Sequence, residues 1–309
     1  MRDQRISVES LDPALLRSLF STRVLKQLAL GFSPPEVEKV KRELTAANKM
    51  LPRSTLAEVY EASFRESVRS QRSEYAYKNA IVQKLLLGKY SLGTTSAGFE
   101  VRIGSSKLDV LLARDYLTAF EIKTERDELV RLSTQVNDYG KACRKIWVLT
   151  SERHVCAVDR ILPESVGIAV LTRKYQISTR REAMPEKGRL DRTSLLRLLR
   201  KSELTSLYQR IVGVARVIPN TQLFAELSEV AAHEPLDSIE KYVASAMLRR
   251  SSARAALLRS LPQSVAACAL AMDLTTPQSE RLISAFNADL TGESLCLPTI
   301  PTFEESNTN

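Results

Sequence analysis

Two carboxylates and one amine stand inside two short apolar segments of this chain. Asp109 lies within residues 107–113, and Glu121 and Lys123 lie within residues 117–123. Both segments otherwise have the composition of β-strands. Because ionised groups are costly to bury unless they are paired or bind a metal, their presence in such segments suggests chemistry.

The spacing of the two segments predicts how these charges meet. A three-residue connection is typical of a short β-hairpin. With Ala113 opposite Leu117, antiparallel counting places Asp109 directly opposite Glu121. The two-residue alternation of side chains places Lys123 on the same face as Glu121. We therefore expect like charges across neighbouring strands, with an amine beside them.

A divalent cation would relieve this repulsion. Two carboxylates at cross-strand distance destabilise each other unless a cation lies between them. Mg²⁺ prefers oxygen ligands, keeps several waters and commonly takes one or two protein carboxylates plus a substrate phosphate. The alternative is that Asp109 and Glu121 are ordinary charged strand ends, one paired with Lys123 and the other facing water.

An Asp on one strand and Glu-x-Lys on the next resembles the PD-(D/E)xK nuclease superfamily. Leu108 stands where the family name has Pro. Residues 131–139 are similar to the Gln-x-x-x-Tyr helix of RecB-like members, with Gln135 and Tyr139 in the two named positions. The resemblance covers roughly residues 74–181 and is greatest to a bacterial subgroup with few characterised members.

The resemblance implies a Mg²⁺- or Mn²⁺-dependent nuclease that hydrolyses phosphodiester bonds, with DNA favoured over RNA. Asp109, Glu121 and the backbone carbonyl of Ile122 would hold the metal. Many members place a further acidic ligand on the first helix or first strand, where this chain has Glu74 and Glu100.

Two further residues have expected catalytic roles. The ammonium of Lys123 can bind the attacking water and stabilise negative charge in the transition state. The resemblance implies that Gln135 orients substrate or water; the alternative is a polar residue packed near a helix surface.

Asn79 is an alternative to Glu74 at the position of the additional ligand on the first helix. This assignment would leave the metal with one carboxylate fewer.

Composition narrows the function classes. A formal charge of +9 and a pI near 9.4 favour polyanionic partners such as nucleic acid. No phosphate-binding loop or dinucleotide motif occurs, so no nucleotide cofactor is expected. Four scattered cysteines predict neither a zinc site nor disulfides. No apolar run approaches a membrane span and no signal-peptide core follows the N-terminus, which predicts a cytoplasmic protein.

The order of helical and strand patterns predicts an α/β fold with a mixed sheet flanked by helices. This order matches the restriction-endonuclease-like fold. The expected organisation is a helical N-terminal extension over residues 1–72, a nuclease-like core over 73–185, a helical C-terminal domain over 186–297 and a disordered tail over 298–309.

The sequence of the helical C-terminal region is compatible with several roles. Its helices are basic and amphipathic, which fits DNA contact, bundle packing or homodimer formation. The alternative to a nuclease is a catalytically inactive nuclease-fold protein that acts as a nucleic-acid-binding or regulatory module.

Overall fold

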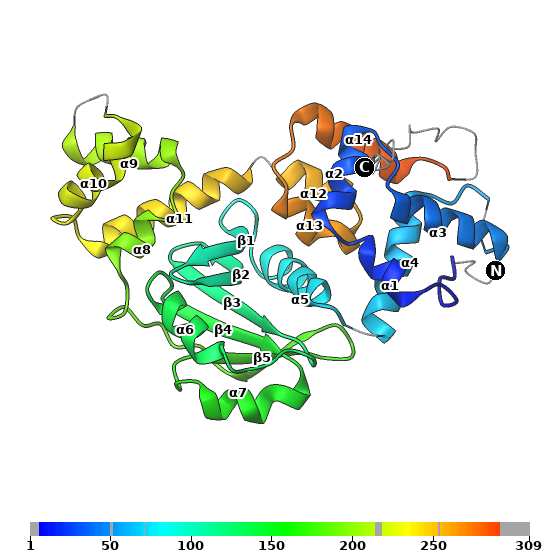
Figure 1. The fold of residues 1–309 in the computed structure, drawn as a ribbon, viewed down its shortest axis with the longest axis horizontal. Coiled ribbons are helices and arrows are strands. Elements are labelled where there is room, and N and C mark those ends of the chain that lie inside the picture. The colour runs from blue at the N-terminus through cyan, green and yellow to red at the C-terminus, as the bar shows by residue number, and fades with distance from the viewer. Residues whose placement is uncertain (1–5, 50–51, 71, 214–217, 253, 291–309) are drawn as a thin grey trace, which may run out of the picture. The chain divides into compact units, whose positions relative to one another are not determined.

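The chain forms two compact units, called unit 1 and unit 2 below. Unit 1 comprises Met1–Asn79 and Ala256–Asn309, and unit 2 comprises Ala80–Ala255. The computed structural model describes residues 6–49, 52–70, 72–213, 218–252 and 254–290 (Figure 1). Within these residues, no helix combines the length and apolar composition needed to cross a membrane.

The regular elements of unit 1 in its described residues are helices joined by turns, and Thr55 and Asp289 form an isolated bridge. Its main helices are α1 (Pro13–Ser18), α2 (Thr22–Leu30), α3 (Pro35–Ala46), α4 (Leu56–Ser70), α5 (Glu74–Ala80), α12 (Ala255–Ser260), α13 (Ala266–Ala271) and α14 (Thr276–Asn287). The C-terminal helix α14 packs on α2 and α4. The N-terminal and C-terminal segments of the chain therefore share one core.

Local capping explains where the first helices begin. The carboxylate of Asp12 accepts a hydrogen bond from Ala14 N at 2.8 Å, before α1. Thr55 and Glu58 exchange reciprocal hydrogen bonds before α4, as their spacing predicts.

Unit 2 is built on a six-stranded mixed sheet with the strand order β1-β2-β3-β4-β5-β6. The strands are β1 (Ser96–Ile103), β2 (Ser106–Ala113), β3 (Leu117–Lys123), β4 (Lys145–Thr150), β5 (Gly167–Leu171) and β6 (Ile177–Arg181). Strands β3, β4 and β5 run parallel to one another, and the other neighbouring pairs are antiparallel. The predicted α/β class with a mixed sheet and flanking helices is confirmed at this level.

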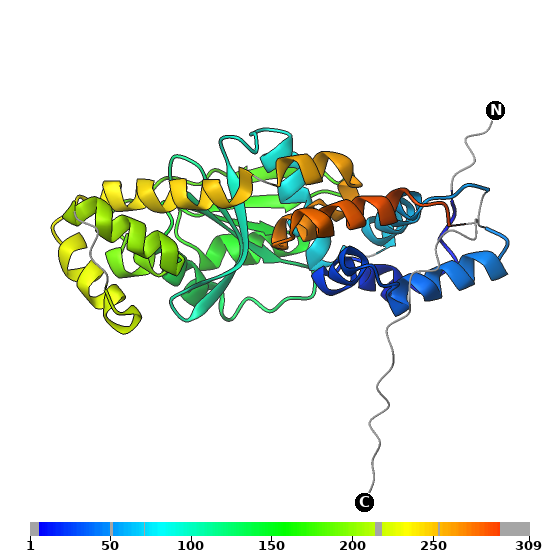
Figure 2. The ribbon, with the colours of Figure 1, turned by 90° about the horizontal axis from the view of Figure 1, so that it is seen from above.

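One face of the sheet packs against helices α6 (Leu132–Gly140), α7 (Val155–Ile161) and α11 (Leu236–Ser252) (Figure 1). Apolar side chains from the strands and from these helices form a continuous core. Figures 1 and 2 show α9 (Lys201–Val212) and α10 (Asn220–Ala231) packed on each other, and α11 also packs on α8 (Arg192–Leu196).

A π-helix, η1 (Ile81–Leu87), continues directly from α5 and contacts β1. The apolar side chains Ile81, Val82 and Leu86 are fully buried. The hydrogen-bond pattern therefore changes from α-helical in α5 to π-helical over residues 81–87.

The structure differs from the sequence expectations in two places. Strand β6 was not expected, because its sequence is polar and half-exposed and lacks alternation. Unit 2 extends to Ala255, whereas the expected nuclease-like core ended at residue 185, and the expected C-terminal domain is shared between the two units. The expected tail over 298–309 lies outside the described residues.

Candidate active site

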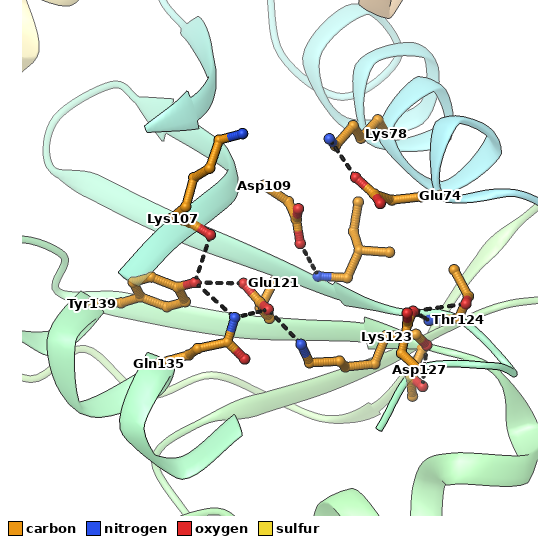
Figure 3. Close-up of polar contacts among 12 residues, drawn as sticks. Glu74, Lys78, Lys107, Asp109, Glu121, Lys123, Thr124, Asp127, Gln135 and Tyr139 are labelled. Atoms are coloured by element: carbon orange, nitrogen blue, oxygen red, sulfur yellow. Dashed lines mark hydrogen bonds and ion pairs between the residues drawn. The ribbon is translucent and has the colours of Figure 1, made fainter. Parts of the chain in front are cut away.

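The β2–β3 hairpin has the register that its spacing predicts, except at Asp109. Ala113 pairs with Leu117, and the ladder continues as far as Val110 and Phe120. Asp109 does not pair with Glu121 as expected. Instead, Asp109 Oδ2 accepts a hydrogen bond from the backbone N–H of Ile122 at 2.8 Å (Figure 3). The side-chain carboxylate thus replaces a backbone acceptor of β2.

Pairing is also interrupted at Asp109 on its other side. The β1–β2 register runs from Phe99 opposite Val110 to Val101 opposite Leu108 and omits the residues between, Glu100 and Asp109. Glu100 has φ of 55°, which is uncommon for a residue other than glycine. Carboxylate oxygens of Glu100 and Asp109 lie within 4.8 Å of each other. Glu100 and Asp109 are therefore a closely spaced pair of acids in unit 2.

Glu121 lies at the centre of a buried polar cluster (Figure 3). Its side chain is only 2% exposed. Glu121 Oε1 accepts hydrogen bonds from Lys123 Nζ at 2.7 Å and Gln135 Nε2 at 2.6 Å, and Oε2 accepts one from the Tyr139 hydroxyl at 2.7 Å. The predicted placement of Lys123 on the face of Glu121 is confirmed, and Gln135 points toward the same carboxylate.

Tyr139 remains a hydrogen-bond donor in this cluster. Burial, followed by the negative charges of Glu121 and Asp109, raises the pKa of the Tyr139 phenol well above its ordinary value. The hydroxyl lies 3.1 Å from the carbonyl oxygen of Lys107 and 2.7 Å from the Glu121 carboxylate. A protonated phenol therefore holds Glu121 in one orientation.

Helix α6 carries two of the three residues that donate hydrogen bonds to Glu121. Gln135 and Tyr139 are four residues apart and share a helical face, while Leu132 and Val136 pack into the core. Lys123 is positioned differently, because parallel pairing of β3 with β4 aligns it with Thr150, whose hydroxyl donates to the Lys123 carbonyl at 2.7 Å. The site is thus assembled from the hairpin, its neighbouring strand and the helix that follows.

Asp138 attaches α6 to the β1–β2 turn. Its Oδ2 accepts hydrogen bonds from Ser105 N at 3.0 Å, Ser105 Oγ at 2.8 Å and Ser106 Oγ at 2.9 Å, and Lys141 Nζ lies 2.7 Å from Oδ1. Gly104 allows this approach, because its φ is +59° and a Cβ there would lie 2.6 Å from the Asp138 carboxylate. Sequence reasoning missed Asp138, although a charged residue between the buried positions Val136 and Tyr139 is a usable signal.

This carboxylate should make stability depend on pH. Burial would raise the pKa of Asp138, but hydrogen bonds from Lys141, Ser105 and Ser106 outweigh it and lower the pKa from 3.8 to about 2. The stabilisation is therefore present above pH 3.8 and is lost as pH falls toward 2. We expect the excess stability of the wild type over Asp138→Asn to shrink by about 2 kcal/mol across this range in urea unfolding.

Ser106→Ala provides the matched variant, because it removes one donor and keeps the carboxylate. This variant should retain a smaller pH-dependent stabilisation than the wild type. A constant stability difference between wild type and Asp138→Asn over the same pH range would contradict the role given to Asp138.

The sequence of the chain matches one known protein family. The family described as "Bacteriophage P4 protein cII" matches residues 67–270, about two thirds of the sequence. This chain belongs to the bacteriophage P4 protein cII family. The segment shared with the cII family includes the whole β-sheet and the residues around Glu121.

No curated protein matches this cII-family member. A solved structure, a protein of unknown function from Silicibacter pomeroyi, aligns with 40% of this chain and 75% of its own chain, with 14% identity and a TM-score of 0.29.

The other candidates for the additional ligand in this cII-family chain lie in unit 1. Glu74 belongs to unit 1, where Lys78 Nζ lies 2.5 Å from its carboxylate. Asn79 is fully buried in unit 1 and bonds the backbone of Gln263 and Ala267, so it serves packing there. Within unit 2, the structure brings Asp109 close to Glu100, and it brings Lys123 and Gln135 to Glu121. The two groups are joined through Ile122, whose N–H donates to Asp109.

Proposed function

We propose that this cII-family chain is a Mg²⁺- or Mn²⁺-dependent nuclease that hydrolyses phosphodiester bonds in DNA. One observation carries the proposal. Glu121 and Lys123 form a buried ion pair on β3, and Asp109 binds the peptide N–H of the residue between them. An ion pair in a buried strand is weak stabilisation, because desolvation offsets its Coulombic attraction. A catalytic role explains it better.

The arrangement of unit 2 supports a restriction-endonuclease-like fold. An opening antiparallel meander of β1, β2 and β3 leads through α6 into parallel β4 and through α7 into parallel β5. The acid and the Glu-x-Lys segment lie on the second and third strands, and Gln135 and Tyr139 lie on the following helix. These are the positions that the PD-(D/E)xK resemblance assigns to them.

The donor atoms fit a hard divalent cation. Glu100 and Asp109 present carboxylate oxygens within 4.8 Å of each other, and such proximity of like charges favours a cation. Lys107 Nζ lies 2.5 Å from the Glu100 carboxylate, so a divalent ion would compete with this lysine. Glu121 Oε1 accepts two hydrogen bonds, whereas Oε2 accepts one within the described residues and keeps one lone pair. A set of oxygen donors without sulfur or imidazole suits Mg²⁺ or Mn²⁺ better than Zn²⁺.

Each residue of the candidate site would then have a separate role. A divalent cation held by Asp109, Glu121 and Glu100, together with the Ile122 carbonyl, would supply charge neutralisation on the phosphoryl oxygens and activation of water. Lys123 uses one of its three N–H groups on Glu121 in the described residues, which leaves donors for the attacking water and a phosphoryl oxygen. Gln135 and Tyr139 would keep Glu121 oriented.

Calorimetric titration with Mn²⁺ tests the site without a substrate. Wild type should bind Mn²⁺, and Asp109→Asn should bind at least about tenfold more weakly, because it removes a charged oxygen ligand. Asp115→Asn is the matched control, since Asp115 is an exposed acid in the turn of the same hairpin. Equal Mn²⁺ affinity in wild type and Asp109→Asn would remove Asp109 from the proposed site.

A cleavage assay distinguishes the nuclease from the binding module. Wild type should cleave DNA with Mg²⁺ or Mn²⁺ and stop when a chelator is added. DNA binding without cleavage under any of these conditions, in a protein that also fails to bind Mn²⁺, would favour the inactive binding module instead.

A further inference from the structure

A pocket of about 150 Å³ opens on the sheet face opposite Glu121. We call it the aromatic pocket. Phe120 and Trp147 are register partners on β3 and β4, and both line it. Because neighbouring strand residues point to opposite faces, Phe120 faces away from the side occupied by Glu121. The aromatic pocket and the candidate active site therefore lie on different faces of one sheet.

The pocket floor is flat and aromatic. The rings of Phe120 and Trp147 are stacked, with centroids 6.3 Å apart and planes 5° apart. Gly167 lets the indole lie across the neighbouring strand, because a Cβ at Gly167 would come within 2.6 Å of the Trp147 ring. Tyr90 and Tyr116 add two half-exposed rings to the lining. Such a surface suits a planar ring.

Basic side chains lie over the two tyrosine rings of the aromatic pocket. The guanidinium of Arg114 lies 5.2 Å from the centroid of Tyr90, and Lys145 Nζ lies 5.9 Å from that of Tyr116. Lys89 also lines the pocket and lies over Tyr90. These contacts place positive charge beside the aromatic rings, where a phosphate attached to a bound ring could be neutralised.

A buried hydroxyl in the lining lacks a partner. Thr95 is 1% exposed, and its Oγ1 has no hydrogen-bond partner within the described residues. A buried polar atom without a partner is costly, so a ligand with a polar edge would stabilise it. Asp115 and Glu182 add carboxylates that can accept N–H groups from the same edge. The occupant should therefore be planar, polar at its edge and linked to an anion.

We propose that the aromatic pocket binds one unpaired pyrimidine base of a single-stranded nucleic acid. A cavity of about 150 Å³ is known to hold one benzene ring, which matches a pyrimidine better than a purine. Base stacking on aromatic side chains together with cations along the backbone is the general mode of single-strand recognition. The pocket is on the face away from the proposed hydrolysis site, so its binding does not depend on a metal or on cleavage.

Trp147 allows a direct test, because it is the one tryptophan in the sequence. We would titrate the full chain with an oligothymidylate of about eight nucleotides in a chelating buffer and follow both Trp147 fluorescence and the anisotropy of a labelled strand. Both signals should change with one affinity. Oligothymidylate should bind more tightly than oligoadenylate or a duplex of equal length.

Variants locate the binding. Tyr116→Leu and Arg114→Ala should each weaken oligothymidylate about tenfold, because one removes a stacking ring and the other a cation. Lys174→Ala, which removes an exposed charge elsewhere in unit 2, should have little effect. Circular dichroism of each variant separates lost binding from lost folding.

Three results would overturn the proposal. One is the absence of oligonucleotide binding in low salt. Another is binding seen by anisotropy at saturation with no change in Trp147 fluorescence. The third is unchanged affinity in folded Tyr116→Leu and Arg114→Ala. Because the experiment contains no free metal, each of these outcomes leaves the proposed nuclease function untouched, and failure of cleavage leaves the pocket untouched.

Discussion

Replacing Lys123 by Met is expected to lower metal-dependent DNA cleavage by about 10²- to 10³-fold, the usual effect of removing a group that stabilises transition-state charge. Met has nearly the length of Lys and no charge, so the volume of this buried position is kept. Glu121 would lose one hydrogen bond but retain those from Gln135 and Tyr139. The variant should lose some stability, because a buried carboxylate loses its cation, and circular dichroism checks that it still folds.

The measurement is the initial rate of DNA cleavage in Mn²⁺, with calorimetric Mn²⁺ binding measured in parallel. Lys123→Met should still bind Mn²⁺, because the proposed ligands are intact. Lys174→Met is the matched control, since it makes the same change at an exposed position of unit 2. A Lys123→Met protein that cleaves DNA at the wild-type rate would rule out the catalytic role of this lysine.

Replacing Glu240 by Ala is expected to reduce the free energy of unfolding by about 3–5 kcal/mol, because it leaves a partly buried guanidinium without its main partner. Glu240 is fully buried on α11. Its carboxylate pairs with Arg144 and accepts a hydrogen bond from Leu117 N, at the start of β3, at 3.4 Å. This residue therefore links α11 to the strand that carries Glu121.

Asp237 provides the matched control for Glu240. It lies on the same helix and also pairs with Arg144, at 2.8 Å, but its side chain is 51% exposed. Water can replace an exposed partner, so Asp237→Ala should change stability much less than Glu240→Ala. Urea unfolding at neutral pH measures both. Equal losses in the two variants would show that burial of Glu240 does not govern its contribution.

Local sequence rules worked where a short segment contains all the interacting groups. The hairpin register, the position of Lys123 beside Glu121 and the shared face of Gln135 and Tyr139 follow from the periods of strands and helices. These features could be predicted because the residues are few positions apart or are linked by a short turn.

The prediction that Asp109 pairs with Glu121 was wrong because it assumed an unbroken β-ladder. Counting treats every backbone group as paired with its neighbour, but the Asp109 carboxylate takes the Ile122 N–H, and Glu100 adopts a left-handed conformation opposite it. A side chain that competes with the backbone for a hydrogen bond cannot be recognised from alternation alone. Glu100, which lies within 4.8 Å of Asp109, is on β1, where the family resemblance had made it one of two candidate ligands.

The order of residues along this chain was sufficient for the α/β class, for the hairpin and for the charges that suggest metal-dependent chemistry, because short-range periodicity encodes them. Folding in three dimensions decided the rest. The Asp138 contacts to the β1–β2 turn, the burial of Glu240 against Arg144 and the aromatic pocket all join residues from elements that are distant in sequence. Their energies come from desolvation and packing between whole elements, which arise only once the sheet and helices have assembled.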